Sequence, residues 1–143
     1  MPVDFERDDV GEKLVAAGFQ QNSPAFFTWL GVVPYLTQDA IGRTLDYMSS
    51  IQNSEVVFDY AEPFENYPAD RRAYIMGVAE SAAARGEPWL SFFDPTELSR
   101  LLGDKGFAIV EDLGIGELAD RFYGALKEGI PIGPGGHVVR AQR

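Results

Sequence analysis

The spacing of hydrophobic and polar residues along the chain predicts two kinds of element that alternate. Apolar residues recur at the spacing of a helix face in four segments, at 8–17, 37–52, 69–85 and 95–105. Runs rich in apolar and β-branched residues predict strands at 25–33, 54–60, 107–111 and 137–141. A further short helix is predicted at 117–125. Because strands and helices alternate, we expect an α/β fold, with a single domain over 1–143 in which helices flank a mostly parallel sheet.

Some details of this pattern predict packing. The segment at 25–33, AFFTWLGVV, is apolar and aromatic almost throughout, which predicts a strand buried on both faces. Tyr74, Val78 and Ala82 share one face of the third helix. Gly106 follows the fourth helix and is expected to end it.

Composition narrows the class of protein. The chain has 143 residues, of which 45% are hydrophobic, so it can build a substantial core. Its formal net charge of -10 would repel nucleic-acid phosphates and anionic membranes, and we expect neither as a partner. The chain has no cysteine, no apolar segment of membrane-spanning length and no apolar leader at its start. We therefore expect a cytoplasmic protein.

A glycine-rich segment and the histidine within it are each explained by a structural role rather than by catalysis or ligand binding. GPGGHVV at 133–139 has the glycines of a phosphate loop, but it precedes a strand and lacks the lysine of such loops, so a turn is favoured over a phosphate cradle. His137 is the only histidine of the chain. A catalytic histidine needs an orienting carboxylate and a nucleophile, which the sequence does not place beside it. A role at the surface or at a strand end is therefore favoured for His137.

The acidic residues are also explained without chemistry. Glu62, Glu65 and Asp70 are close in sequence but have neither calcium-loop spacing nor histidine co-ligands, so a solvated loop is favoured over a metal site. Asp94 and Glu97, which flank a proline at the first helical position, are explained as the start of a helix rather than as a catalytic pair. We expect no metal site.

The remaining candidate positions lie where strands end. Ligands of open α/β sheets bind outside the carboxyl ends of the strands. This rule selects Asp4 and the segments 30–35 and 59–60, although position alone favours a structural role for each of them. Tyr35, in the second of these, could line a pocket or cap the core.

Several sequence blocks, taken in order, resemble the later part of a known family. The blocks are VDF at 3–5, KLVAAGF at 13–19, SPAFFTWLGVVPYLT at 23–37, SEVVFDY at 54–60, GEPW at 86–89, FDPTELSRLLGDKGFAIVEDLG at 93–114 and ELADRFYG at 117–124. In order and spacing they resemble the C-terminal half of class I S-adenosylmethionine-dependent methyltransferases of the leucine carboxyl methyltransferase-like family, which includes bacterial O-methyltransferases. The resemblance covers nearly the whole chain.

The resemblance implies a fold and a reaction. The family has a Rossmann-like three-layer fold whose seven-stranded sheet has the order 3-2-1-4-5-7-6, and this chain would supply strands four to seven, with the last strand antiparallel. Such enzymes move a methyl group from S-adenosyl-L-methionine to a carboxyl or hydroxyl oxygen. Positioning and desolvation carry most of this catalysis, so a dedicated base is not required.

The resemblance also implies site residues by position. Asp4 and Phe5 match an aspartate followed by a hydrophobic residue, a pair that lies beside the adenine of the cofactor in the family. Leu30, Gly31 and Tyr35 match the stretch after strand four, which faces the methionine end of the cofactor and the substrate. Many members have Glu where Leu30 stands. The resemblance thus implies cofactor-binding roles for the first four residues and a substrate-binding role for Tyr35, while the catalytic residues stay unassigned.

Part of the family pattern lies outside this sequence. The glycine-rich cofactor loop, and the acidic residue that holds the ribose, would precede Met1. We therefore expect a truncated product or a split half, inactive alone, and an open edge at the strand 25–33 that is covered by self-association into a homo-oligomer or by a chain supplying the N-terminal half. The alternative function is a non-catalytic protein-interaction domain derived from a methyltransferase. An unrelated flavodoxin-like module is a third, weaker alternative, and the methyl acceptor is not encoded in any recognisable motif.

Overall fold

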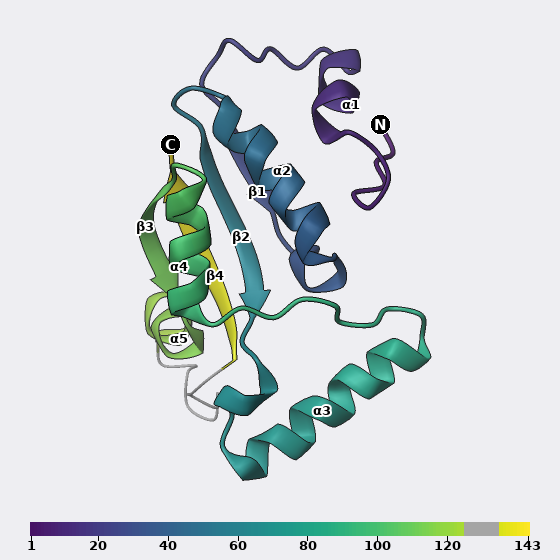
Figure 1. Ribbon diagram of the computed structural model, residues 1–143. Helices are drawn as coiled ribbons and strands as arrows, with labels where there is room; N and C mark the ends of the chain where they lie inside the picture. Colours follow the sequence, from purple (N-terminus) through teal and green to yellow (C-terminus); the bar gives the residue numbers. More distant parts are fainter. Residues whose placement is uncertain (125–134) are drawn as a thin grey trace.

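Four strands form one open sheet in the computed structural model of the protein, which describes residues 1–124 and 135–143 (Figure 1). The strands lie in the order β1 (Phe26–Trp29), β2 (Glu55–Ala61), β4 (Gly136–Gln142) and β3 (Ala108–Leu113). β1 is parallel to β2, whereas β4 is antiparallel to both of its neighbours. This is the 4-5-7-6 part of the expected seven-stranded order. The α/β fold class and the antiparallel last strand are therefore confirmed.

The described helices are α1 (Val10–Ala16), α2 (Gln38–Ser50), α3 (Ala69–Ala84), α4 (Pro95–Asp104) and α5 (Ile115–Phe122), with 3-10 turns η1 (Val33–Tyr35) and η2 (Phe64–Asn66). Each predicted helix and strand is found, with boundaries shifted by a few residues. In Figure 1, α2 and α4 lie along the sheet, whereas α3 projects away from it. Within the described residues, none of the helices has both the length and the apolar composition needed to cross a membrane.

Local chemistry fixes several helix ends. Thr37 Oγ1 accepts a hydrogen bond from Ala40 N–H at 3.3 Å at the start of α2, and Asp94 Oδ1 accepts one from Thr96 N–H at 2.9 Å at the start of α4. Such caps satisfy amide donors that have no partner inside the helix, and each stabilises a helix by about 1 kcal/mol. Gly106 follows α4 with a φ of +84°, as predicted for a helix-ending glycine.

The core lies between the sheet and the helices α2 and α4. The predicted apolar stripe of α2 is confirmed, because Ile41 and Leu45 are completely buried and Met48 is nearly so. The same buried cluster includes Trp29, Val33, Val56, Phe58, Tyr60, Leu98, Leu102, Phe107, Val139 and Ala141. Phe5 packs against this cluster, with its ring centroid 5.6 Å from that of Trp29 on β1.

One packing prediction is wrong. β1 has only four residues and is not buried on both faces, since Phe26 is 61% exposed. The reason is that β1 is the outermost strand of the described sheet, with β2 on one side only. On α3, the face shared by three apolar residues is buried only in part: Tyr74 is 72% exposed and Val78 is also exposed, whereas Ala82 is buried. Most of α3 lies away from the sheet, so an apolar stripe on this helix does not meet the core (Figure 1).

The central position of α2 gives a stability prediction. Leu45→Ala removes completely buried methyl groups, and we expect it to lower the free energy of unfolding by about 2–5 kcal/mol in urea denaturation. Leu90 is 50% exposed, so Leu90→Ala is the matched control and should change that free energy by less than about 1 kcal/mol. Equal losses in the two variants would contradict this description of the core.

Candidate functional site

A cavity of about 270 Å³ lies at the carboxyl ends of β1 and β2, where α/β sheets bind ligands. Gly31 and Tyr35 line it from the segment after β1, and Asp59 and Tyr60 line it from the end of β2. The other walls come from α3, from the segment between α3 and α4, from the first residue of α5 and from the start of β4. We call it the strand-end cavity.

A hydrogen bond shapes the turn that follows β1. Gly31 N–H donates to Asp59 Oδ1 at 2.6 Å, which joins the ends of the two parallel strands. Gly31 has a φ of +70°, a conformation that favours glycine. A Cβ placed on Gly31 would have no neighbour within 4 Å, so the backbone here faces open space. The end of β1 is thus accessible to a ligand.

The segment between α3 and α4 is held across the same turn. Leu90 N–H and Ser91 N–H both donate to Pro34 O, at 2.7 and 3.2 Å. These bonds fix the segment against η1, and Trp89 lies in the wall of the strand-end cavity. The GEPW block at 86–89, noted in the sequence for its resemblance alone, therefore reaches the candidate site.

The walls of the cavity are largely aromatic, with one guanidinium among them. Tyr35, Tyr60, Tyr67 and Trp89 supply the rings. Arg71, in the first turn of α3, also lines the cavity, and its Nη1 is buried without a hydrogen-bond partner among the described residues. A buried charged donor without an acceptor is costly. The cavity therefore fits a ligand that presents an oxygen acceptor to Arg71.

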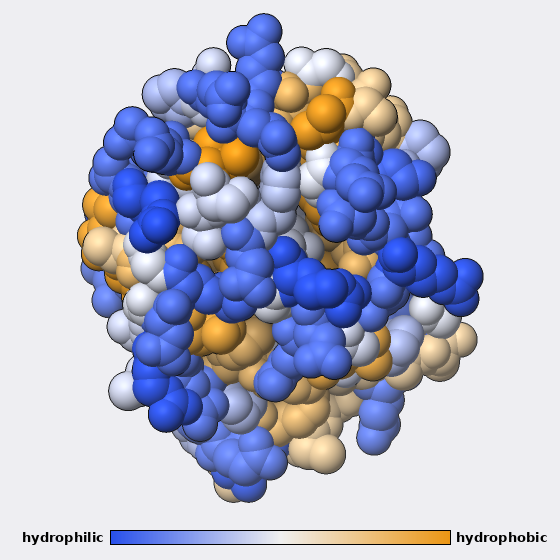
Figure 2. All heavy atoms as spheres, turned by 45° about the horizontal axis from the view of Figure 1, so that its top comes forward, coloured by the Kyte–Doolittle hydropathy of each residue, from blue (hydrophilic) through white to orange (hydrophobic). Residues whose placement is uncertain are grey.

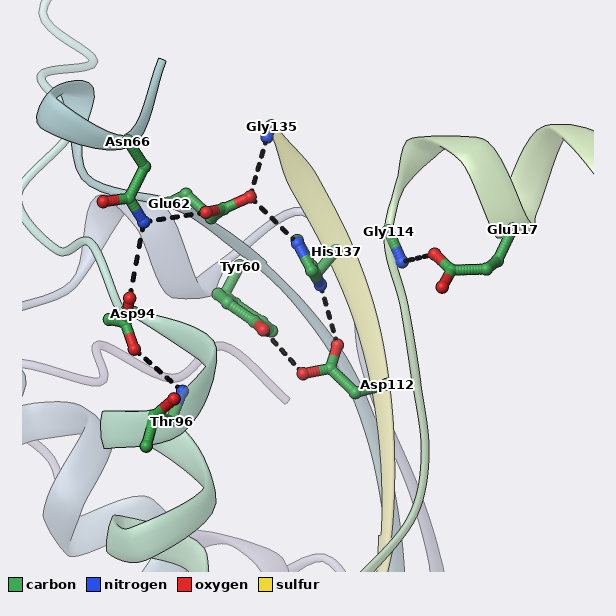
Figure 3. Close-up of polar contacts among 10 residues, drawn as sticks. All are labelled: Tyr60, Glu62, Asn66, Asp94, Thr96, Asp112, Gly114, Glu117, Gly135 and His137. Atoms are coloured by element: carbon green, nitrogen blue, oxygen red, sulfur yellow. Dashed lines mark hydrogen bonds and ion pairs between the residues drawn. The ribbon is translucent and has the colours of Figure 1, made fainter. Parts of the chain in front are cut away.

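Behind one wall lies a cluster of four side chains, Tyr60, Glu62, Asp112 and His137, which we call the histidine–carboxylate cluster (Figure 3). His137 Nδ1 lies 2.9 Å from Asp112 Oδ1, and His137 Nε2 lies 3.1 Å from Glu62 Oε1. Tyr60 Oη–H donates to Asp112 Oδ2 at 2.7 Å. The rings of Tyr60 and His137 are stacked, with centroids 5.0 Å apart. The cluster joins β2, β3 and β4 at one end of the sheet.

Burial and hydrogen bonding set the charges of this cluster. Burial lowers the pKa of His137, but the hydrogen bonds to Asp112 and Glu62 raise it by more, so the pKa lies above its ordinary value. Burial, followed by the hydrogen bond to Asp112, raises the pKa of Tyr60 well above its ordinary value. The phenol of Tyr60 therefore stays protonated at neutral pH.

Glu62 is anchored from several directions. Its Oε1 also accepts from Gly135 N–H at 3.0 Å, and its Oε2 accepts from Asn66 Nδ2 at 2.8 Å. Asn66 in turn lies 3.5 Å from Asp94, the residue that caps α4 (Figure 3). Because Glu62 is only 7% exposed, the predicted solvated-loop role is wrong for this residue.

The structure brings together only some of the residues selected from the sequence. Gly31 and Tyr35 line the strand-end cavity, while Leu30 is 50% exposed and does not line it. Asp4 accepts a hydrogen bond from Glu6 N–H within its own turn, and Phe5 lines a different hollow, beside α1 and α2. The cofactor- and substrate-binding roles of these residues stay predictions.

His137 and Arg71 were not selected from the sequence. His137 lies at the start of β4, which agrees with the strand-end role favoured above, and its side chain is only 15% exposed. The site role of His137 depends on its contact with acidic residues at the ends of other strands. A single sequence does not reveal that contact. Residues 133–134 of the GPGG motif lie outside the described residues, so its turn stays a prediction.

Cofactor and metal binding can be judged from the donors present. Within the described part of the chain, no three His, Asp or Glu side chains are arranged to hold a metal ion. For S-adenosyl-L-methionine, the fitting features are the open backbone at Gly31, which no Cβ covers, and the aromatic rings nearby. These suit the methionine and sulfonium end of the cofactor.

Sequence comparison gives two matches. Residues 1–49 match the model of the leucine carboxyl methyltransferase family. The whole chain is 29% identical over 143 residues to YktD of Bacillus subtilis (strain 168), which its name describes as an inferred S-adenosyl-L-methionine-dependent methyltransferase. The match covers 99% of this chain and 47% of YktD, so the chain spans about half the length of this curated relative.

Comparison with solved structures supports the fold. An S-adenosylmethionine-dependent methyltransferase from Mesorhizobium loti superposes with a TM-score of 0.57 at 16% identity, over 99% of this chain and 67% of that one. The pyocyanin biosynthetic protein PhzM superposes with a TM-score of 0.52 at 14% identity, over 92% of this chain and 37% of PhzM. At such identities the likeness concerns the fold alone. Taken with the sheet order, it shows the fold of class I methyltransferases. In sequence, the chain is similar to the leucine carboxyl methyltransferase family over residues 1–49 and to YktD over nearly its whole length.

Proposed function

We propose that this chain forms the acceptor side of an S-adenosylmethionine-dependent O-methyltransferase. The observation that supports an oxygen acceptor is Arg71, which lines the strand-end cavity and whose Nη1 is buried without a partner among the described residues. A guanidinium binds carboxylate or phenolate oxygens well, because its planar N–H groups match their geometry. The aromatic rings around it would hold the apolar part of the acceptor.

The reaction asks little of the protein beyond placement. When bound, the cofactor supplies an electrophilic methyl group. Arg71 would hold the acceptor oxygen as an anion or as a strong hydrogen-bond acceptor, and the aromatic walls of the cavity would exclude water from it. A charged hydrogen bond of this kind contributes about 1.5–3 kcal/mol. Gly31 and Tyr35, at the mouth of the cavity, would lie between the acceptor and the cofactor.

Cofactor binding also needs groups that these residues do not supply. The sequence has no glycine-rich turn between a strand and the helix that follows it, which class I folds use to bind the cofactor. We propose that a strand pairs with the open edge of β1, and that another chain or a further segment of a longer protein brings such a turn. A second copy could cover the edge but could not supply the turn, because it has the same sequence. A cytoplasmic location would suit a chain without cysteine.

A non-catalytic interaction domain is the second candidate. The observation that favours it is β1 itself, an outermost strand on which Phe26 is 61% exposed. Strands of this kind pair readily with other chains. This candidate predicts partner binding at β1 and no dependence on Arg71.

The acceptor proposal can be tested on the chain alone with two probes that differ in charge. Benzoate presents two anionic oxygens, whereas benzamide has nearly the same shape without the charge. We expect Arg71→Gln to weaken benzoate binding by about 10-fold or more and to leave benzamide binding unchanged, as measured by NMR titration. Arg85 ends the same helix and bonds Ser81, so Arg85→Gln is the matched control. If Arg71→Gln leaves benzoate binding unchanged, or if neither protein binds benzoate, the acceptor proposal fails.

The need for a further segment gives a second prediction. We expect isothermal titration of the isolated chain with S-adenosylhomocysteine to give no measurable binding heat, because the backbone at Gly31 alone offers few contacts to the nucleoside. Micromolar binding by the isolated chain would contradict the proposal that other residues complete the cofactor site.

The open edge gives a third prediction. If β1 pairs with another strand, the chain should sediment faster than a monomer, and Phe26→Lys should reduce this association because charge on an edge strand opposes pairing. Val110, an exposed apolar residue of β3 at the other side of the sheet, provides the control Val110→Lys, which should keep the association. A clean monomer that captures no partner would contradict the proposed pairing.

A further inference from the structure

We infer that His137 is a positioning residue, which as a doubly protonated imidazolium joins the carboxylates on its two sides and so holds one wall of the strand-end cavity. The part of this inference that concerns catalysis rests on the proposed function, because it involves the same strand-end cavity. Its structural content is independent of methyl transfer, and so is the first of its tests.

The geometry around the imidazole ring of His137 favours a proton on each of its two nitrogens. Each ring nitrogen of His137 faces a carboxylate oxygen, at 2.9 Å on the Asp112 side and 3.1 Å on the Glu62 side. An ionised carboxylate only accepts hydrogen bonds, so each nitrogen must donate. A neutral imidazole has one N–H and would turn the lone pair of its other nitrogen toward an anionic oxygen. The arrangement therefore favours the charged ring.

The two carboxylates are themselves committed to this arrangement. Asp112 accepts from the phenol of Tyr60 through its second oxygen, and Glu62 accepts from Asn66 through its second oxygen. The side chains of Glu62 and Asp112 are only 9% and 18% exposed. Two carboxylates this poorly solvated are stabilised by a cation between them, because a buried carboxylate left without a partner is strongly unfavourable.

The other groups around the ring do not replace this charge. On the β2 side Tyr60 stacks on the imidazole, and its phenol stays neutral. On the α5 side Gly114 lies against the ring, and the carboxylate of Glu117 is taken up by Gly114 N–H at 2.8 Å. On the α4 side Asp94 lies beyond Asn66 and caps the helix. Among the described residues named here, every ionisable neighbour of the ring is an acid, which favours the imidazolium.

The cluster determines the position of two parts of the cavity wall. Tyr60 and the backbone at Gly135 and Gly136 line the cavity directly. Glu62 Oε1 accepts from His137 and from Gly135 N–H, and Glu62 N–H donates back to Gly135 O at 3.0 Å. The ring of Tyr60 is fixed through Asp112 in the same way. Loss of the proton would break one of the two histidine bonds and release one side of this wall.

The same geometry argues against a role for His137 as the proton acceptor of the reaction. A general base needs a ring nitrogen with a free lone pair directed at the acceptor. Both nitrogens of His137 are engaged by carboxylates, and the side chain is 15% exposed. The two roles predict opposite dependences on pH. Activity that needs His137 as a base rises as pH passes the pKa of the histidine, whereas a cavity wall that needs the imidazolium is lost over the same interval.

The protonation state can be measured without ambiguity, because His137 is the only histidine among 143 residues. We expect the ¹⁵N shifts of the labelled ring to show both nitrogens protonated at pH 7, with a titration midpoint above that of a free histidine. Glu62→Gln and Asp112→Asn should each lower this midpoint. Glu55→Gln, which removes a carboxylate that pairs with Arg140 at the other end of β2, is the matched control and should leave it unchanged.

The positioning role has its own readout. The backbone amide shifts of Gly135 and Gly136 should change with the same midpoint as the ring of His137. The charge of His137 should make the wild type more stable than His137→Gln. This difference in unfolding free energy should be largest at pH values below the pKa of the histidine in the unfolded chain. It should be lost as pH rises through the higher pKa of His137 in the folded protein. Once a completed enzyme is in hand, its activity should fall over the same interval.

Three results would overturn the inference: a neutral single-tautomer ring at pH 7, a midpoint at or below the free-histidine value, or amide shifts at residues 135–136 that do not follow the histidine. If His137→Gln does not fold, Glu62→Gln carries the same test. If methyl transfer fails but the ring is found doubly protonated, His137 has no role in catalysis and still positions the wall of the strand-end cavity.

Discussion

The insertion of β4 between β2 and β3 is the constraint on which the candidate site depends. In the antiparallel register of β2 and β4, Tyr60 lies opposite His137 and Ala61 lies opposite Gly136. The register of β3 and β4 places Asp112 opposite Val139, close enough for its carboxylate to reach His137. The same two pairings anchor the far end of the sheet, where Arg140 bonds Glu55. One strand thus provides the middle of the sheet and the centre of the histidine–carboxylate cluster.

Two cations in and beside the cavity have opposite environments, and this separates their roles. His137 has an acceptor on each ring nitrogen, so it has nothing left to offer a ligand. The Nη1 of Arg71 has no acceptor among the described residues although it is buried. In a chain with a formal net charge of -10 the rest of the surface would repel an anion. In the proposed function, an anionic acceptor would therefore be bound at this guanidinium and not by the overall charge of the chain. Figure 2 shows one face of the molecule, on which hydrophilic residues cover much of the surface and hydrophobic residues lie between them.

Local patterns predicted the elements well because the physics behind them is local. The stripe of α2, the proline and aspartate that start α4, and the glycine that ends it all act within a few residues. The errors lie where neighbours in space decide. The apolar run after residue 25 reads as a central strand, but β1 is outermost in the described sheet. The sequence places three apolar residues on one face of α3, but it does not show that this helix projects away from the sheet.

The candidate site could be predicted only in part for the same reason. Gly31 and Tyr35 follow a strand, and the rule that ligands bind at strand ends selects them from the sequence alone. The pair of Glu62 and His137 is separated by 75 positions, and only the strand register brings the two side chains together. Arg71 carries no motif, because an arginine in the first turn of a helix is ordinary until its cavity is known.

The edge of β1 and the strand-end cavity are physically coupled. Gly31 follows β1 directly, and its N–H bonds Asp59 at the end of β2, so the hydrogen bond that closes the cavity on one side also ends the strand. A strand added to the free edge of β1 would end beside Gly31, at the same level of the sheet. Its following turn would then lie over the open backbone at that residue. Under the proposed function, completing the sheet and completing the cofactor site would thus be one event, because the same added segment would cover the edge of β1 and the backbone at Gly31.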